Sequence, residues 1–232
     1  MQETMIKISD VRKVYKIGNE KVVALDRINA EIQKGEICCI FGTSGSGKST
    51  LLNQLAGMEK PTQGKVIINK VDITKLQENQ MAAFRQKHIG FIFQAYNLLP
   101  YMTALENTAL PLMFQGYGRK DREARAASLL EKVGLGKRLH HYPSQMSGGQ
   151  QQRVGIARAF AVSPEVIFAD EPTGNLDTKT TSQIMEMVLE IAGKNNQTIV
   201  LVTHDPEMAS YADRILTLID GNIVKDERKE SR

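Results

Sequence analysis

Gly42-Thr43-Ser44-Gly45-Ser46-Gly47-Lys48-Ser49 is the stretch that decides the fold. It matches the pattern G-x-x-x-x-G-K-[ST], and it lies between an apolar run at 37–41 and an expected helix over 48–58. Phosphate-binding loops require this order, because inward-turned N–H groups of the loop and the helix N-terminus together hold phosphate oxygens. A flexible Gly/Ser turn is the alternative, which the flanking strand and helix disfavour. The stretch therefore predicts a site for a nucleoside triphosphate.

Two side chains of this loop have chemical roles of their own. Lys48 is placed to reach the terminal phosphates, and the hydroxyl of Ser49 can ligate Mg²⁺. Together with the neighbouring Thr50, the residues from Gly42 to Ser49 form the expected nucleotide-binding set.

A second group of polar residues follows the apolar run 166–169, which predicts a buried strand. Asp170 and Glu171 stand at the carboxyl end of that strand, where open α/β sheets bind ligands. We expect Asp170 to join the magnesium shell and Glu171 to accept a proton from attacking water. His204 follows another such run, 198–202, and is expected to orient water at the terminal phosphate. The alternatives are an ordinary polar strand end and a structural histidine.

The apolar pattern predicts strands at both ends of the chain. Residues 5–41 alternate as strands do, residues 64–73 predict short strands around a turn, and 216–224 predict a hairpin around Asp220-Gly221. The buried runs at 166–169 and 198–202 are separated by a helical pattern. Strands that alternate with helices predict an α/β protein with a mainly parallel sheet.

The middle of the chain predicts a helical insertion. Thr103 and Glu106 form a capping-box pattern, and Asp121 to Val133 is an amphipathic helix that Gly134 stops. We therefore expect one domain over 1–232, in which 1–94 and 161–232 form the core and 95–160 the helical part.

The composition is that of an ordinary globular protein and identifies no partner. The 30 basic and 26 acidic residues are mixed along the chain, unlike the concentrated basic stretches of nucleic-acid binders. The longest apolar runs are far below the about 18 residues that span a bilayer, so we do not expect a channel. The two cysteines, Cys38 and Cys39, are adjacent in an apolar run, which predicts buried thiols in a reduced cytosolic protein.

Ser147-Gly148-Gly149-Gln150 resembles the L-S-G-G-Q signature of ABC ATPases, with Met146 in place of the leucine. The same residues fit the capping pattern S-x-x-Q of a helix start. Both interpretations can hold, because a helix that begins with two glycines exposes N–H donors and a positive dipole end to a phosphate. The resemblance covers nearly the whole chain. It implies a P-loop NTPase core with a mainly parallel sheet, an N-terminal antiparallel β subdomain and an inserted α-helical subdomain.

The resemblance also implies a reaction, the hydrolysis of ATP to ADP and phosphate, with ATP and Mg²⁺ as cofactors. In this family the signature surface contacts the ATP held by a second subunit, so that two ATP molecules lie between head-to-tail copies. The catalytic residues implied are Lys48, Glu171 and His204.

Three further positions resemble family positions. Tyr15 resembles the aromatic residue that stacks on adenine, and Gln94 the glutamine that links magnesium to the helical part. Asp177 belongs to a segment that resembles the loop crossing the dimer interface. The metal ligands implied are Ser49, Gln94 and Asp170. The plainer interpretations are a strand aromatic for Tyr15, a hydrogen-bonded loop residue for Gln94 and a helix N-cap for Asp177.

Finer matches at 94–107, 142–149 and 171–177 resemble the macrolide-exporter and lipoprotein-releasing ATPases and their cell-division relative. They imply a homodimer bound to an integral-membrane permease, with or without an accessory adaptor protein, on the cytoplasmic face of the membrane. The expected work is efflux, or mechanical transmission across the envelope, on a peptide, antibiotic or lipoprotein.

Other functions remain as alternatives. Inside the family, the complex could signal, or act in cell division, without moving a substrate. Outside transport, DNA-repair and ribosome-associated proteins use the same ATPase, but they add coiled coils, zinc modules or a second ATPase that this sequence lacks. We therefore expect no nucleic acid. A small-molecule kinase is disfavoured by the signature segment and by a carboxylate suited to activating water.

Overall fold

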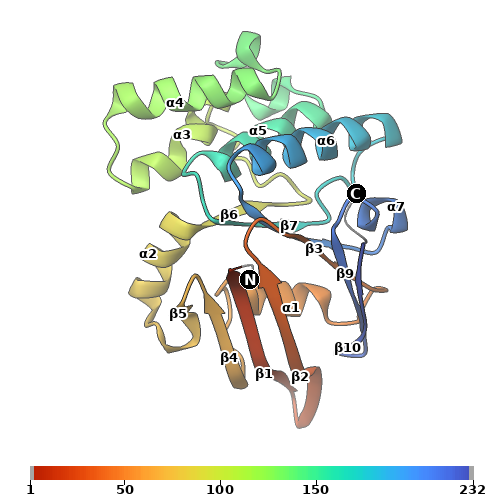
Figure 1. The fold of residues 1–232 in the computed structure, drawn as a ribbon. Coiled ribbons are helices and arrows are strands. Elements are labelled where there is room, and N and C mark those ends of the chain that lie inside the picture. The colour runs from red at the N-terminus through yellow and green to blue at the C-terminus, as the bar shows by residue number, and fades with distance from the viewer. Residues whose placement is uncertain (1–2, 230–232) are drawn as a thin grey trace. The chain divides into compact units, whose positions relative to one another are not determined.

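The computed structural model describes residues 3–229, which form two compact units (Figure 1). The first unit takes the described residues of Met1–Ala83 and of Asn196–Arg232, and the second is Phe84–Asn195. Residues 1–2 and 230–232 of the expected core lie outside the described range. The second unit is therefore an insertion into the sequence of the first.

The first unit is built mainly of strands. Its elements are β1 (Thr4–Ile17), β2 (Glu20–Gln33), β3 (Ile37–Phe41), α1 (Lys48–Leu55), β4 (Gln63–Ile68), β5 (Val71–Asp72), the 3-10 turn η1 (Ile73–Lys75), the start of α2 (Glu78–His88), β8 (Thr198–Thr203), α7 (Pro206–Ala209), β9 (Arg214–Ile219) and β10 (Asn222–Arg228). An antiparallel sheet has the order β2-β1-β4-β5. In a second sheet β3 runs parallel to both β8 and β9, and β10 closes the edge antiparallel to β9.

The composition of β3 and β8 explains their place in this sheet. Cys38, Cys39 and Ile40 of β3 are buried, and every residue of β8 is buried. Continuous apolar runs are typical of parallel strands that are covered on both faces. Both cysteines are free and buried, and burial raises the pKa of each thiol, as the sequence predicts for inert apolar positions.

The second unit is mainly helical. Its elements after the end of α2 are β6 (Ile89–Ile92), α3 (Ala104–Phe114), α4 (Arg119–Lys132), the 3-10 turns η2 (Gly136–Arg138) and η3 (Pro143–Gln145), α5 (Gly148–Phe160), β7 (Val166–Asp170) and α6 (Thr178–Lys194). The helices α3, α4 and α5 pack on one another, with Leu112, Leu130 and Ile156 wholly buried (Figure 1). β6 and β7 pair in parallel.

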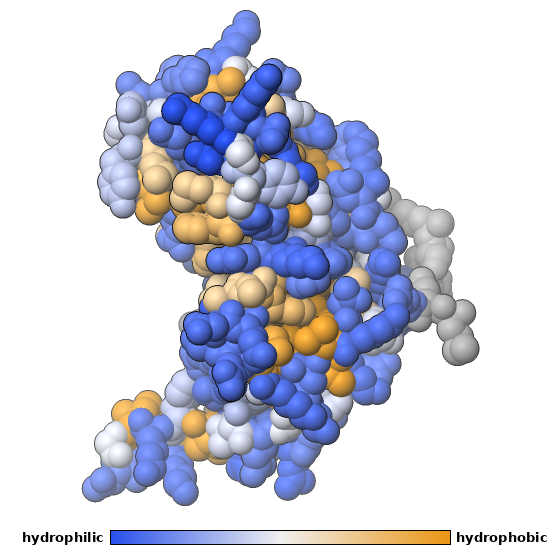
Figure 2. Space-filling model, turned by 90° about the vertical axis from the view of Figure 1, so that its left-hand side faces the viewer, coloured by the Kyte–Doolittle hydropathy of each residue, from blue (hydrophilic) through white to orange (hydrophobic). Residues whose placement is uncertain are grey.

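One apolar surface of this unit is exposed. Met113 and Phe114 at the end of α3, with Tyr117 before α4, are 42%, 59% and 40% exposed. Figure 2 views the side on which α3 joins α4 in Figure 1, and it shows orange hydrophobic patches among hydrophilic surface. Among residues 3–229, no helix is both long and apolar enough to cross a bilayer.

Most of the elements predicted from the sequence are present. The fold class is confirmed, with an antiparallel N-terminal sheet, a mainly parallel sheet and a helical insertion. Thr103 and Glu106 form the predicted capping box of α3, and Gly134 follows α4 with a φ of 78°. The helix predicted over 48–58 is wrong at its end: α1 stops at Leu55, because Gly57 adopts a φ of 62° that ends the helix.

Arg214 joins three strands of the first unit. The buried guanidinium donates from Nε and Nη2 to both carboxylate oxygens of Asp226 on β10, at 2.7 and 2.6 Å, and from Nη1 to the carbonyl oxygen of Glu31 on β2. The hydrogen bonds from Arg214 hold the pKa of Asp226 below its ordinary value of 3.8. This contact ties the chain's last described strand to its second.

We expect Arg214→Met to lower the free energy of unfolding by about 2–3 kcal/mol at pH 7, because three hydrogen bonds to a charged donor are lost. The matched control is Arg228→Met, whose side chain is 55% exposed and lies 3.9 Å from Glu36; it should change stability by less than about 0.5 kcal/mol. Urea titrations measure both. Asp226 has a lowered pKa in the folded protein. The loss of unfolding free energy caused by Arg214→Met should therefore have its full size above pH 3.8 and become smaller as the pH falls below that value. Equal losses for both variants at pH 7 would contradict this account.

Candidate functional site

The phosphate-type loop lies between β3 and α1, as the sequence predicts. Lys48 is the first residue of α1, is only 7% exposed, and donates from Nζ to the carbonyl oxygen of Thr43 at 2.7 Å. The ammonium group therefore lies across its own loop. A triphosphate that entered the loop would offer Lys48 anionic oxygens in place of this carbonyl, and charge-assisted hydrogen bonds are the stronger kind.

Two features of the loop fit an anion. Ser46 is 3% exposed, and its Oγ has no hydrogen-bond partner within the described part of the chain. Gly47, the N-cap of α1, has a φ of 102° and makes no side-chain cap, so the first N–H groups of α1 depend on another acceptor. A buried hydroxyl and helix N–H groups without internal acceptors are donors that phosphate oxygens can satisfy.

Close packing behind the loop explains its glycines. A Cβ at Gly47 would lie 2.6 Å from the carbonyl oxygen of Ala24, and one at Gly42 would lie 2.4 Å from that of Leu218. The N–H of Gly221 also donates to the carbonyl oxygen of Ser46 at 2.9 Å. The backbone of the loop is thus held by β2 and by the turn between β9 and β10.

His204 lies at the same sheet edge as the phosphate-type loop. β3 and β8 are parallel neighbours with Phe41 opposite Thr203, so Gly42 and His204 are the next residues beyond that pair. His204 is exposed, and Asp205 after it caps α7 by accepting from the N–H of Glu207. The first unit therefore brings the phosphate loop and the predicted histidine together.

Tyr15 lies in β1, as its plainer interpretation as a strand aromatic predicts, and its stacking on adenine stays a prediction. Its hydroxyl donates to Glu59 Oε2 at 2.8 Å, and the Nζ of Lys13 lies 5.1 Å from the ring centre. Burial, followed by the hydrogen bond to Glu59, raises the pKa of Tyr15. One ring face and the hydroxyl are thus engaged within the protein, which fixes the orientation of the ring.

The second unit gathers the other predicted polar residues at one edge of its strand pair. Ile92 of β6 lies opposite Ala169 of β7, so the segment containing Gln94 and the residues Asp170 and Glu171 leave the pair on the same side. Asn175 donates from Nδ2 to the carbonyl oxygen of Gln94 at 3.0 Å. These contacts place Gln94 beside the loop that follows the two carboxylates.

Glu171 has a strained backbone. Its φ is 42°, in the left-handed region that costs a non-glycine residue roughly 1–2 kcal/mol. The N–H of Gly174 donates to its carbonyl oxygen at 3.0 Å and closes the turn. Strain of this kind persists only where surrounding contacts fix it, and it gathers at functional sites.

The donor atoms of Ser49, Gln94 and Asp170 are all oxygen, which is the donor type that Mg²⁺ prefers. Such ions are commonly held by one or two carboxylates together with substrate phosphates. The residue types therefore fit magnesium.

Ser147 is the N-cap of α5, as predicted, and forms a capping box with Gln150. The Ser147 N–H donates to Gln150 Oε1 at 3.1 Å, and the Gln150 N–H donates to Ser147 Oγ at 3.3 Å. Gly148 and Gly149 occupy the first turn, where the helix offers their N–H groups no acceptor. A Cβ at Gly149 would lie 2.9 Å from Thr180 Cγ2, so a side chain there would crowd α6. The start of α5 is therefore capped by Ser147 and also presents the N–H groups of Gly148 and Gly149 as donors.

Asp177 is the N-cap of α6, which confirms its plainer interpretation. It accepts from the N–H and Oγ1 of Thr180 at 2.9 and 2.7 Å, and these hydrogen bonds lower the pKa of its carboxyl group. Capping leaves the preceding residues, Asn175 and Leu176, on the connecting loop.

Sequence reasoning missed Arg158 and Tyr96. Arg158 of α5 donates to the carbonyl oxygens of Tyr96 and Asn97, just beyond Gln94. The available signal was a basic residue between Ala157 and Ala159 in the helix expected to begin at Ser147, and this signal gives no indication of its partner.

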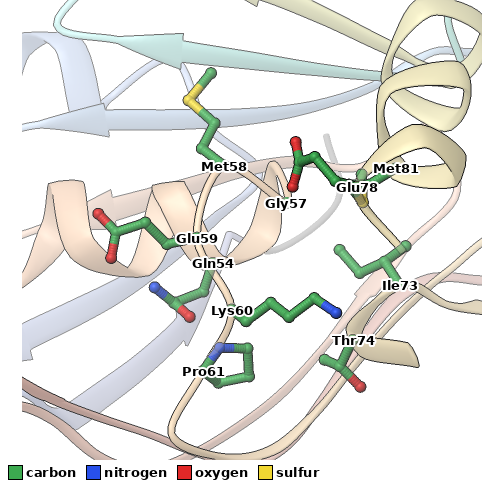
Figure 3. Close-up of a pocket in the computed structure, with 10 residues that line it drawn as sticks. All are labelled: Gln54, Gly57, Met58, Glu59, Lys60, Pro61, Ile73, Thr74, Glu78 and Met81. Carbon is green, nitrogen blue, oxygen red and sulfur yellow. The ribbon is translucent and has the colours of Figure 1, made fainter. Parts of the chain in front are cut away.

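A separate small pocket lies beside α1. It is lined by the residues drawn in Figure 3, which come from the end of α1, the following loop and the segment from Ile73 to Met81. Lys60 and Ile73 face one another across it, whereas Glu59, the partner of Tyr15, lies on the opposite side of the loop (Figure 3). None of the residues predicted to bind nucleotide lines this pocket, and we assign it no ligand.

Comparison with known families gives a match to the ABC transporter model over residues 25–174. An uncharacterized ABC transporter ATP-binding protein of Thermotoga maritima is 48% identical over 97% of this chain and 96% of its own length. The macrolide export ATP-binding/permease protein MacB of Vibrio parahaemolyticus is 45% identical over 97% of this chain. The match covers 34% of that longer relative.

A solved structure agrees with the fold. The dimeric, post-hydrolysis structure of the ATP-binding cassette MJ0796 bound to ADP and Pi has a TM-score of 0.91 and 41% identity, over 98% of this chain and all of that one. MJ0796 comes from Methanocaldococcus jannaschii.

Two loop glycines allow a matched test of the packing behind the phosphate-type loop. Gly47→Ala should lower the free energy of unfolding by about 3 kcal/mol, because it combines left-handed strain with the approach to Ala24. Gly45 has a φ of 81° but open space at its Cβ position, so Gly45→Ala should cost about 1 kcal/mol. Chemical denaturation measures the difference, and equal losses would show that packing against β2 contributes nothing.

Proposed function

The chain belongs to the ABC transporter family, and we propose that it is the ATP-hydrolysing subunit, working as a pair to drive a separate membrane permease. The capped start of α5 at Ser147 carries the proposal, because it presents N–H donors on a second helix start, in addition to the one that follows the phosphate-type loop. One nucleotide bound by one chain does not require two such surfaces. A pair of chains that share two nucleotides does.

Within one chain, we propose that the loop from Gly42 to Thr50 holds the phosphates of ATP and that Tyr15 stacks on adenine. Lys48 exchanges the carbonyl of Thr43 for the terminal phosphates. Ser49, Gln94 and Asp170 would hold Mg²⁺, which neutralises phosphate charge when bound. Glu171 accepts the proton of the attacking water, and His204 orients that water at the terminal phosphate.

Between chains, we propose that Ser147 to Gln150 of one copy contact the ATP held by the other. The N–H groups of Gly148 and Gly149 then exchange water for anionic phosphate oxygens when a partner brings its nucleotide. Pairing depends on ATP for this reason, and hydrolysis weakens it. The solved structure of the relative MJ0796 is a dimer bound to ADP and Pi, which supports pairing around nucleotide.

The helical part, residues 95–160, is proposed to transmit the motion to the permease, with Gln94 as the hinge. It carries a groove lined by Met102, Ala109, Leu110 and Met113, with charged residues of both signs at Glu106, Arg119, Arg122 and Glu123. An apolar floor with a charged rim suits an amphipathic segment of a membrane protein. The chain would then lie on the cytoplasmic face of the membrane through its permease.

The similarity to MacB, whose name includes both export and a permease, supports efflux as the work of the complex. Envelope signalling or a cell-division role without transport is the second candidate, because contacts with a substrate would belong to the permease. Uptake or extrusion of a labelled compound that depends on the copurifying permease distinguishes transport from signalling.

Glu171→Gln tests the enzyme directly. We expect ATP hydrolysis to fall by at least about a hundredfold, because the proton acceptor is lost, and an ATP-bound dimer to accumulate. Phosphate release and sedimentation in ATP measure the two effects. The control is Glu186→Gln, an exposed glutamate on α6, which should behave as wild type. Undiminished hydrolysis by Glu171→Gln would remove Glu171 as the base.

Phe114→Asp tests the permease contact, because Phe114 follows Met113 of the groove at the exposed end of α3. We expect the isolated chain to keep its ATPase activity within about twofold, because Phe114 is 59% exposed and lies outside the proposed nucleotide site. The membrane protein that copurifies with a tagged wild-type chain should no longer copurify with the tagged Phe114→Asp chain. Lys137→Asp, on η2, is the control for added negative charge and should retain the partner. Retention of the partner by Phe114→Asp would place the contact elsewhere.

A further inference from the structure

Arg158 connects α5 to the segment that follows Gln94. It is partly buried, and its Nη1 donates to the carbonyl oxygen of Asn97 at 2.6 Å while Nη2 donates to that of Tyr96 at 2.8 Å. Burial lowers the pKa of Arg158, but a guanidinium remains charged at neutral pH. Its planar fork matches two neighbouring carbonyl oxygens, which one ammonium group cannot do at once.

The two carbonyls are held in an unusual backbone. Tyr96 and Asn97 have φ values of 60° and 48°, both in the left-handed region. A tyrosine is strained in that region, and a pair of non-glycine residues keeps the conformation only where contacts fix it. The two hydrogen bonds from Arg158 are such contacts. They set the path of the chain two residues beyond Gln94.

Tyr96 also reaches the other end of α5. A Cβ at Gly148 would lie 2.7 Å from the Tyr96 hydroxyl oxygen, so the phenol lies directly against the first turn of the helix. The carbonyl of Tyr96 contacts Arg158 near the last turn. One residue thus touches both ends of α5, and the same segment contacts Asn175 through the carbonyl of Gln94.

We propose that Arg158 is a positioning residue that locks Tyr96 and Asn97 to α5, so that movement at the hinge Gln94 is transmitted to the surface Ser147–Gln150. The inference rests on the proposed function, in which Gln94 serves the chain's own ATP and Ser147–Gln150 serves the partner's. Occupation of one site then favours completion of the other. Without the lock each surface would respond to its own nucleotide alone.

Arg158→Lys is the informative substitution, because it keeps the positive charge and loses the fork. In the Glu171→Gln background we expect the ATP-dependent dimer to weaken about tenfold, within the range of roughly 5–150-fold typical of coupling between sites. Binding of a fluorescent ATP analogue to the monomer should stay within about twofold, because the hydrogen bonds of Arg158 are to Tyr96 and Asn97, which are not among the proposed ATP-binding residues. In the otherwise wild-type chain, kcat should fall about tenfold with little change in the monomer's affinity for ATP.

Arg153→Lys is the matched control. Arg153 lies on the same helix and donates from Nη1 to the carbonyl oxygen of Val133 at 3.0 Å and from Nη2 to Gln183 at 3.4 Å, on contacts that do not involve 94–97. Arg153→Lys also replaces a two-branched guanidinium by a single ammonium group, but it should dimerise as the Glu171→Gln parent does. Tyr96→Phe removes only the hydroxyl beside Gly148, and should weaken the dimer in the same direction by about threefold.

Sedimentation equilibrium in ATP, analogue titration and steady-state kinetics give the result. Weak dimerisation with intact analogue binding for Arg158→Lys, and normal behaviour for Arg153→Lys, supports the lock. Unchanged dimerisation and kcat would overturn it, and so would loss of analogue binding together with dimerisation, because the defect would then be general. Failure of the Glu171→Gln parent to dimerise in ATP would instead refute the proposed function.

Discussion

The N–H groups at the starts of α1 and α5 are the constraint on which the rest of this molecule depends. The first turn of a helix has donors without internal acceptors, and each start here is shaped to leave them accessible. Gly47 begins α1 without a side-chain cap, and Ser147 caps only the third residue of α5. Strands β3 and β7 bring polar residues to the edges where nucleotide chemistry is proposed, and close packing around the glycines keeps the turns in place. In the proposed pair, a triphosphate shared by two chains would satisfy both helix starts at once.

Local patterns were sufficient to predict most of the fold. Buried runs such as Ile37–Phe41 and Thr198–Thr203 have a composition typical of covered parallel strands, and capping residues fix where helices begin. The starts of α3 and α5 were therefore predicted to the residue. Helix α2 (Glu78–His88) was missed, because its sequence is mostly polar and only Met81 and Phe84 are buried. Its place is decided by contacts distant in sequence, which no local period contains.

The proposed site likewise has features that the sequence predicted and features that it did not. The types of Lys48, Asp170 and Ser147 follow from motif chemistry, and the resemblance to the ABC family, which the comparisons confirm, places them in one pattern. The sequence did not predict that Lys48 donates to the carbonyl oxygen of Thr43 or that the backbone of Glu171 is strained. Nor did it predict the link from Arg158 to Tyr96. Such features depend on which carbonyl a long side chain meets in three dimensions, and that is a property of packing and not of spacing.

Site-directed cross-linking tests the central claim, that α5 of one copy completes the nucleotide site of another. Cys38 and Cys39 are buried with raised thiol pKa values, so new surface cysteines would be the reactive ones. One Glu171→Gln chain would carry Ser44→Cys and a second, of different tagged mass, Ser147→Cys. A short bifunctional maleimide should join the two chains in the presence of ATP and not in its absence. If both chains bind ATP and no mixed product forms, the surfaces do not meet across a nucleotide, and the account is wrong.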